Sequence, residues 1–300
     1  MRKRCFAVLM SCILLFMSNC NILEANAEVC YYRNQKGVSF TKEEYDKINK
    51  YFDEDEISKM SEFVAEELKK NEIVETDRET AYYEVIEKLD ADGNVTDVKE
   101  REINYMEMKS KLAEKKMAKS TSGGGIYDDA TYKTSMKKVT MIGEKSGASV
   151  NRVTITNEWL ELPKTRSFDV IALRIGSAAL TVSPESIKAT QVWDYKNKIE
   201  YNSMGDHVRK ASKGIGVSMN LSNKAEKKIV SELKVTFVSG SDPLKIYGSY
   251  QHAKENVSLK TSKKYTISKD GLGNVIKFDD SVKDKYDGMK GINIKLTLGI

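Results

Sequence analysis

Apolar and polar residues alternate in short segments along residues 126–300, and turn residues separate the segments. Alternation with a period of two places every second side chain on one face of a β-strand. The clearest segments carry Val153, Ile155 and Trp159; Val217, Met219 and Leu221; Leu233, Val235 and Phe237; and Ile292, Ile294, Leu296 and Leu298. Further strands are predicted over 133–142, 168–175, 190–195, 244–250, 264–268 and 275–278. About ten strands with few helical windows predict a mainly β fold with a C-terminal antiparallel β-sandwich.

Two of these segments make specific predictions about burial. Residues 168–175 are almost continuously apolar, which is typical of a strand buried on both faces. Over residues 291–300 the alternation is strict, so we expect the last strand to be tied into the sheet, with the four aliphatic residues named above facing the core and Asn293, Lys295 and Thr297 facing away from it.

Residues 28–120 begin with a helical pattern instead. Thr41 and Glu44 have the spacing of a capping box, and Asp53 and Glu56 repeat it. An apolar face then recurs at helical spacing through residue 69, at Ile57, Met60, Val64 and Leu68. We therefore expect helices in the first half of this region.

A β-hairpin is predicted after the helices. Residues 81–89 and 95–105 read as strands, and the polar residues 90–94 between them form a short loop. The charged residues 109–119 are either helical or loose. Because this region has too few apolar residues for a large core of its own, it either docks on the rest of the chain or stays mobile.

Composition changes at residues 121–125, where serine, threonine and glycine predict a flexible linker. Residues 28–120 have 17 Lys and Arg against 24 Asp and Glu, a net charge of −7, whereas residues 121–300 have 29 against 19, a net charge of +10. The predicted division is therefore an acidic region of helices and hairpin (28–120) and a basic sandwich (126–300). Opposite charges joined by a flexible linker favour docking of the first part on the second, as a shield or pro-segment.

The N-terminus has the layout of a secretory signal peptide over residues 1–27. A basic head is followed by a mostly apolar stretch, residues 6–17, that is too short to span a bilayer, and the small residues Ala25 and Ala27 flank Asn26 before the expected cleavage point. Cys12 and Cys20 leave a lipoprotein signal as an alternative. No run of 18 apolar residues follows, so we expect a secreted, extracellular chain without a transmembrane span. After cleavage only Cys30 remains, which excludes an internal disulfide.

Few residues in the chain suit catalysis. The sequence has none of the short motifs that are typical of zinc-dependent hydrolases, of esterases or of proteins that bind nucleotide phosphates. Only His207 and His252 are available as bases with a pKa near neutrality. His207 lies in a polar loop, whereas His252 ends a segment in which aromatic, amide and imidazole groups alternate. Tyr247, Tyr250 and His252 are therefore candidates for a polar binding face, with ordinary strand-end packing as the alternative.

Two acidic runs raise the question of calcium. Asp90, Asp92 and Asn94 match the start of an EF-hand loop, but Val95 and Arg101 occupy the positions that require glycine and glutamate, so a turn explains this run better. The second run is a candidate site for Ca²⁺, the one cofactor considered, and consists of Asp279, Asp280, Asp284 and Asp287.

The basic sandwich predicts an anionic partner, for which a cell-surface polymer, a glycan or lipid are candidates. Its lysines are dispersed, and they do not alternate with aromatic side chains on which nucleic-acid bases could stack. Specific recognition of nucleic acid is therefore not expected. Trp159 is expected in the core. Trp193 has polar neighbours and is a candidate platform for a carbohydrate or peptide, with core packing as the alternative.

Several motifs resemble those of a family of uncharacterised secreted proteins from Gram-positive bacteria, which have a helical N-terminal region and a C-terminal β-domain. The motifs are Trp159-Leu160-x-x-Pro163-x-x-Arg166-x-x-Asp169-Val170-Ile171-Ala172-Leu173, Tyr250-Gln251-His252-Ala253, Lys264-Tyr265-Thr266-Ile267-Ser268 and Tyr286-Asp287-Gly288-Met289, with Thr41-Lys42-Glu43-Glu44-Tyr45 and Asp53-Glu54-Asp55-Glu56-Ile57 before them. The resemblance implies export and a two-part layout. It implies no activity, cofactor or site residue.

Two functional hypotheses follow from the sequence. The first is a secreted binding or surface-interaction module without enzymatic activity, because catalytic residue types are scarce and the β-sandwich offers an interaction face. The second is a secreted hydrolase that uses two carboxylates, which are sufficient for glycosidic chemistry.

Overall fold

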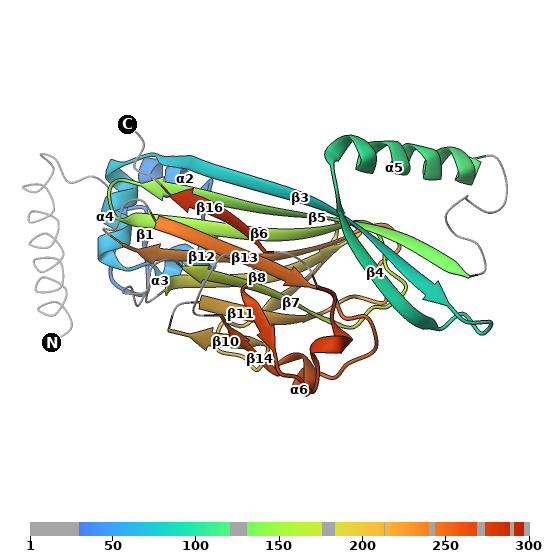
Figure 1. The fold of residues 1–300 in the computed structure, drawn as a ribbon. Helices are drawn as coiled ribbons and strands as arrows, with labels where there is room; N and C mark the ends of the chain where they lie inside the picture. The colour runs from blue at the N-terminus through green and yellow to red at the C-terminus, as the bar shows by residue number, and fades with distance from the viewer. Residues whose placement is uncertain are drawn as a thin grey trace, which may run out of the picture. The chain divides into compact units, whose positions relative to one another are not determined.

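Antiparallel strands form most of the structure, as the alternating sequence pattern predicts (Figure 1). This computed structural model describes residues 30–120, 131–175, 184–212, 214–239, 244–268, 274–288 and 291–296. The chain forms two compact units that divide between Ala65 and Glu66. The mainly β fold class with antiparallel sheets is confirmed. The predicted signal peptide lies outside the described residues.

The first unit is built around the two predicted capping boxes. Its elements are β1 (Tyr32–Arg33), β2 (Ser39–Phe40), α2 (Lys42–Asn49), α3 (Glu54–Lys59) and the start of α4 (Glu62–Lys70). At α2 the Glu44 amide donates to Thr41 Oγ1 at 3.2 Å, and the Thr41 amide donates to Glu44 Oε2 at 2.8 Å. Asp53 and Glu56 make the same reciprocal pair at α3. Both helix starts are confirmed, because the box satisfies amides that have no partner within the helix.

The apolar face predicted to run unbroken through residue 69 is divided between two helices. Helix α3 ends at Lys59, and Met60 is extended with φ −63° and ψ 133°. The Asn34 side-chain amide donates to the carbonyls of Ile57 at 3.0 Å and Met60 at 2.9 Å. A side chain more than twenty residues earlier in the chain thus provides hydrogen-bond donors for backbone carbonyl groups at the end of α3. Local sequence pattern does not reveal such a distant partner.

Two antiparallel sheets dominate the second unit. The seven-stranded sheet has the order β4 (Val95–Ile103), β3 (Ile73–Leu89), β5 (Tyr132–Ser146), β6 (Val150–Glu161), β12 (Ile229–Val238), β8 (Pro184–Trp193) and β9 (Asn197–Tyr201). The five-stranded sheet has the order β10 (Val208–Ala211), β11 (Gly214–Asn220), β7 (Phe168–Ile175), β13 (Leu244–Gln251) and β16 (Ile292–Leu296). The second unit also contains a short separate pair of strands, β14 (Tyr265–Ile267) and β15 (Ile276–Phe278). Its helical elements are α5 (Tyr105–Ser120), α6 (Leu259–Ser262) and η1 (Lys283–Lys285).

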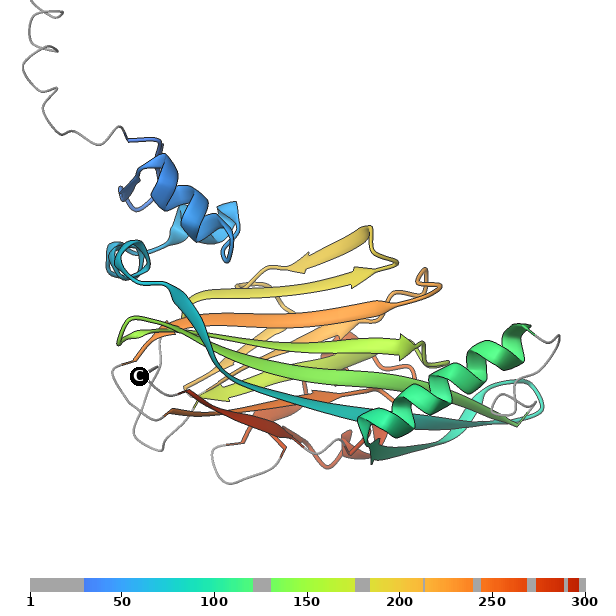
Figure 2. The ribbon, with the colours of Figure 1, turned by 90° about the horizontal axis from the view of Figure 1, so that it is seen from above.

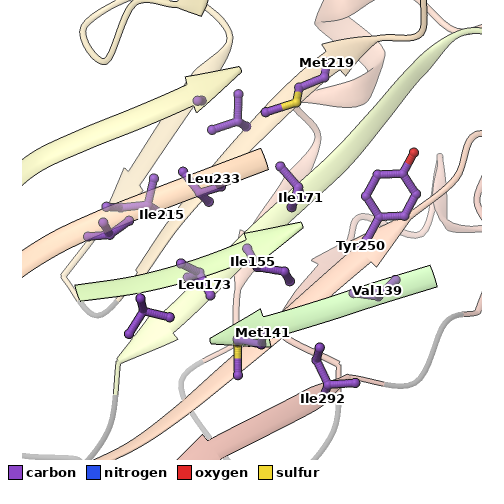
Figure 3. Close-up of a cluster of buried hydrophobic side chains, with 14 of the residues drawn as sticks. Val139, Met141, Ile155, Ile171, Leu173, Ile215, Met219, Leu233, Tyr250 and Ile292 are labelled. Atoms are coloured by element: carbon purple, nitrogen blue, oxygen red, sulfur yellow. The ribbon is translucent and has the colours of Figure 1, made fainter. Parts of the chain in front are cut away.

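The main core lies between the two sheets. Val139, Met141 and Ile155 of the seven-stranded sheet pack in one buried cluster with Ile171 and Leu173 of the five-stranded sheet (Figure 3). This shared core defines a β-sandwich.

Strand β7 is buried on both faces, as its continuous apolar sequence predicts. Ile171 and Leu173 face the main core, whereas Val170 and Ala172 belong to a second buried cluster with Tyr265 of the β14–β15 pair. The strand also lies in the interior of its sheet, between β11 and β13. Its two core faces explain why it lacks alternating polar residues.

The predicted hairpin belongs to the sandwich rather than to the N-terminal unit. Strand β3 pairs with β5 from Ile73 to Lys88 and carries β4 at the sheet edge. Helix α5 lies alongside β3 and β5 in Figure 2, and its Met108 packs in a buried cluster with Ile103 and Met136. The compact units therefore divide within α4, and not at residues 121–125, which lie outside the described residues. Backbone pairing decided this division, and the charge contrast between regions carries no information about it.

The sheet edges show where the sequence pattern is weakest. The sequence pattern does not predict β9 and β10, because their side chains are mostly exposed and show no inward-outward alternation. Strand β16 follows the prediction, since Ile292, Ile294 and Leu296 are buried while Asn293 and Lys295 are exposed. Residues 297–300 lie outside the described residues.

Candidate functional site

A buried charged cluster occupies one part of the interface between the two sheets. Lys137 of β5 lies between two carboxylates: its Nζ is 2.5 Å from Glu100 Oε2 on β4 and 2.5 Å from Asp287 Oδ2, in the segment between η1 and β16. The three side chains are 0%, 8% and 1% exposed. An isolated charge in a protein interior is energetically costly, and the contacts of Lys137 with Glu100 and Asp287 offset that cost.

Electrostatics separates the two carboxylates. Burial, together with the charge of Asp287, raises the pKa of Glu100 to about 9. Burial also opposes ionisation of Asp287, but the charge of Lys137 outweighs it and the pKa of Asp287 is lowered. The pKa of Lys137 is raised, because the two carboxylates outweigh its burial. Near pH 7 Glu100 therefore carries a proton beside an Asp287–Lys137 ion pair.

A second buried group adjoins the first. His252 Nδ1 lies 2.9 Å from Asp169 Oδ1, and the Tyr250 hydroxyl donates to Asp169 Oδ2. The Trp159 indole donates to the Tyr250 hydroxyl at 3.0 Å. Burial lowers the pKa of His252, but the charge and hydrogen bond of Asp169 outweigh it, and the net pKa is raised. The groups are joined where the His252 amide donates to Asp287 Oδ1 at 2.9 Å.

These polar residues stand at strand positions that face the core. Lys137 shares the parity of Val139 and Met141 in β5, and Asp169 shares that of Ile171 and Leu173 in β7. A charged side chain at an inward position of a predicted strand is the signal by which the sequence could have indicated them. Sequence reasoning did not single out Lys137, Glu100 or Asp169.

The predicted binding residues are placed mainly inside the protein. Tyr250 and His252 are 1% and 0% exposed, so they do not form an exposed polar face. Tyr247 lies on the other face of β13, with the Arg174 guanidinium 4.2 Å from its ring centroid. Trp193 is half-buried against the main core, and Trp159 is fully buried as predicted. The alternative of strand-end packing with a hydrogen-bonded histidine describes Tyr250 and His252.

The four candidate calcium ligands are not brought together. Asp287 is buried against Lys137, while Asp280 is exposed and pairs with Lys283 at 3.0 Å. Within the described ranges, no group of three or more potential ligands is arranged to hold a metal ion. Calcium binding by Asp279, Asp280, Asp284 and Asp287 stays a prediction.

The other acidic run forms the predicted turn. Asp90 Oδ1 accepts hydrogen bonds from the Asp92 amide at 3.0 Å and the Asn94 amide at 2.8 Å. Gly93 has φ +78°, which glycine adopts without strain. The turn joins β3 to β4 and places its tip beside a surface hollow.

This first hollow has a volume of about 390 Å³ and is lined by Gly93, Asn94, Val95, Lys164, Thr165, Arg166, Asn223, Lys254, Glu255 and Asn256. Hydrogen bonds fix the segments that form it. The buried Glu87 carboxylate accepts from the amides of Lys164 at 2.7 Å and Thr165 at 2.9 Å. Arg166 donates to the Ala225 carbonyl at 2.6 Å. The basic side chains therefore stand on an ordered backbone.

A second hollow, of about 380 Å³, also includes Arg166, so the two adjoin. Its lining residues are Lys116, Lys133, Glu161, Leu162, Arg166, Glu226 and Lys227. The turn after β8 holds the segment around Lys227, because Asp194 Oδ1 accepts a hydrogen bond from the Lys227 amide at 2.9 Å. Lys116 and Lys227 are exposed. The sequence predicted an anionic partner for the basic sandwich, but tertiary structure alone shows where its lysines meet.

The sandwich architecture is the class that the fold defines. No family model matches the chain, and no curated protein matches it. Among solved structures, it is similar to the collagen-binding domain from a Staphylococcus aureus adhesin, at 7% identity over 49% of this chain and 87% of that one, with a TM-score of 0.27. It is also similar to a chain from a structure described as pH-induced modulation of Streptococcus parasanguinis adhesion by Fap1 fimbriae, at 14% identity over 52% and 80%, with a TM-score of 0.26. Likenesses at this level identify no binding residues or partner.

Among the residues that the structure describes, none of the helices combines the length and the apolar character needed to cross a lipid bilayer.

Proposed function

We propose that this protein is an exported β-sandwich module that binds an anionic surface polymer at the two adjoining hollows. The observation that supports the proposal is the charge of their lining. Six basic residues, Lys116, Lys133, Lys164, Arg166, Lys227 and Lys254, line the hollows against three glutamates, Glu161, Glu226 and Glu255. A concave basic surface concentrates field lines and attracts an extended polyanion.

The arrangement suits binding better than catalysis. The titratable groups with large pKa shifts described above are buried, out of reach of a dissolved substrate. Lys164 and Lys227, in contrast, are exposed on segments whose backbone amides are held by Glu87 and Asp194. Fixing the backbone before binding lowers the entropic cost of association.

Titration with heparin, as a soluble polyanion, tests the proposal. In a variant with Lys164→Gln, Lys227→Gln and Lys254→Gln, we expect affinity to fall by about tenfold or more, because charge-assisted contacts are lost. We also expect binding of the parent protein to weaken steeply as salt is added.

The matched control is a triple variant with the same change in net charge, Lys198→Gln, Lys210→Gln and Lys245→Gln. These exposed lysines lie on β9, β10 and β13 and line neither hollow. Equal losses of affinity in both triple variants would show that net charge alone attracts heparin, and absence of binding by the parent protein would overturn the proposal.

The hydrolase hypothesis has one specific observation in its favour, which is that Glu161 and Glu226 line the same hollow. Two carboxylates across a cleft are the minimum for glycoside hydrolysis. Release of reducing sugar from surface glycans, abolished by Glu161→Gln and by Glu226→Gln, would support it against the binding module. Export itself is tested by sequencing the N-terminus of the protein recovered from the culture medium.

A further inference from the structure

We propose that Lys137 and Asp287 become joined by an intramolecular amide bond, which the folded chain forms by itself with Glu100 as the proton carrier. The geometry carries this proposal. Lys137 Nζ lies 2.5 Å from Asp287 Oδ2, which places an amine against a carboxyl group inside the sandwich. Glu100 Oε2 lies 2.5 Å from the same nitrogen.

The electrophile is held as well as the nucleophile. Asp287 Oδ1 accepts the His252 amide hydrogen at 2.9 Å, so one oxygen of the carboxyl is fixed while the other contacts Lys137. The His252 amide is also placed to stabilise negative charge that develops on Oδ1 when the amine adds to the carbon. Proximity of this kind turns a condensation that is slow between separate molecules into an intramolecular step.

The surroundings exclude water. The rings of Tyr83, Trp159 and Tyr250 lie around the Lys137 ammonium, with centroids 5.6, 5.6 and 5.3 Å from Nζ. Lys137 and Trp159 are fully buried. A dry site protects the amide product from hydrolysis.

The reaction balances without a further reactant. The Lys137 ammonium transfers a proton to Asp287 Oδ2, which leaves a neutral amine and a carboxylic acid. The amine electron pair then forms a bond to Asp287 Cγ, and the carbonyl electrons move onto Oδ1. Glu100 gives its proton to the departing Oδ2 hydroxyl and takes one from the nitrogen. The carbonyl re-forms as the bond to Oδ2 breaks, and one water leaves.

Glu100 suits this role because it is protonated where the reaction needs a donor. Its pKa of about 9, which follows from burial and from the charge of Asp287, keeps the proton on at neutral pH. It regains the same protonation state at the end of the sequence. The step therefore consumes neither oxidant nor cofactor.

The bond would tie distant parts of the chain together. Lys137 is on β5 of the seven-stranded sheet, and Asp287 precedes β16 of the five-stranded sheet, 150 residues later. A covalent link across the sandwich limits the unfolded state as a disulfide does. Cys30 is the one free cysteine in the described part of the chain, so among these residues such a link would serve in place of a disulfide.

Mass spectrometry of the purified full chain tests the proposal. We expect the intact mass to be lower than the sequence mass by one water molecule, also after denaturation. Trypsin should fail to cleave after Lys137 and should release a branched peptide that joins residues 134–138 to residues 286–290. A wild-type protein with the full sequence mass would overturn the proposal, whatever the variants do.

Two variants of β4 test the role of Glu100. Glu100→Gln keeps the side-chain size but has no acidic proton, so we expect the full sequence mass and two separate peptides. Glu102→Gln, at an exposed position of the same strand, should retain the cross-link. A cross-link of undiminished yield in Glu100→Gln would show that Glu100 is not the proton carrier.

Discussion

The Trp159 indole donates a 3.0 Å hydrogen bond to the Tyr250 hydroxyl, and this contact joins the two sheets of the sandwich. The same hydroxyl donates to the Asp169 carboxylate. A tyrosine hydroxyl has one proton to donate and two lone pairs to accept with, so Tyr250 serves both neighbours at once. Its replacement affects two buried groups rather than one.

Tyr250→Phe is therefore expected to destabilise the fold. The variant keeps the ring but leaves the Trp159 donor and one Asp169 oxygen without this partner, at positions that are fully buried. The expected loss is about 1–3 kcal/mol in the free energy of unfolding, measured by urea denaturation. Tyr195→Phe, at a side chain that is 74% exposed, is the control and should change little. Equal stability of the two variants would contradict the role of the hydroxyl.

His252 predicts a pH dependence of stability. Its pKa in the folded protein is raised above the ordinary value of 6.5, because the Asp169 charge outweighs burial, while Asp287 and Lys137 act on it with opposite signs. The folded state therefore binds the proton more tightly than the unfolded state. This stabilisation is fully present below pH 6.5 and is lost as pH rises through the folded-state pKa.

Urea denaturation of wild type and His252→Gln across this pH range measures the effect. We expect the wild-type advantage in the free energy of unfolding to shrink as pH rises above 6.5, the ordinary histidine pKa. An advantage that stays constant or grows with pH would show that the histidine is neutral in the folded protein.

Gly248 of β13 faces the opposite sheet at close range. A Cβ at this position would stand 2.7 Å from Met141 Sδ and 2.8 Å from Ile155 Cδ1, both in the opposite sheet. Gly248→Ala should cost about 1–3 kcal/mol of stability through overpacking, visible as a lower thermal midpoint. Gly288→Ala, where a Cβ meets no heavy atom within 4 Å, should leave the midpoint close to wild type.

Strand β16 contributes to the main core through one face. Ile294 is 1% exposed, so Ile294→Ala should cost about 2–5 kcal/mol from lost burial and the cavity that it leaves. Lys295→Ala, at the adjacent exposed position, should change stability by less than about 0.5 kcal/mol. Similar values for the two variants in chemical denaturation would contradict the assignment of the inward face.

Local sequence was sufficient wherever a short pattern fixes the backbone. The capping boxes at Thr41 and Asp53 predicted two helix starts, because their partners are only three residues away. Alternation predicted the inward face of β16, and the continuous apolar run of β7 predicted its double burial. Edge strands such as β9 are not predicted, because their side chains are mostly exposed and the alternation of apolar and polar residues is lost.

The sequence by itself determined a mainly β chain, the helix starts and the inward faces of its strands, since each depends on residues close together in the chain. Tertiary structure alone decided that the hairpin joins the sandwich sheet, because strand pairing depends on partners that local pattern does not name. It also decided that Glu100, Lys137 and Asp287 meet, and that Tyr250 and His252 are buried. Asp287 is one of four aspartates within residues 279–287, and contacts with Lys137, 150 residues away, and with the His252 amide give it buried partners that the sequence pattern does not reveal.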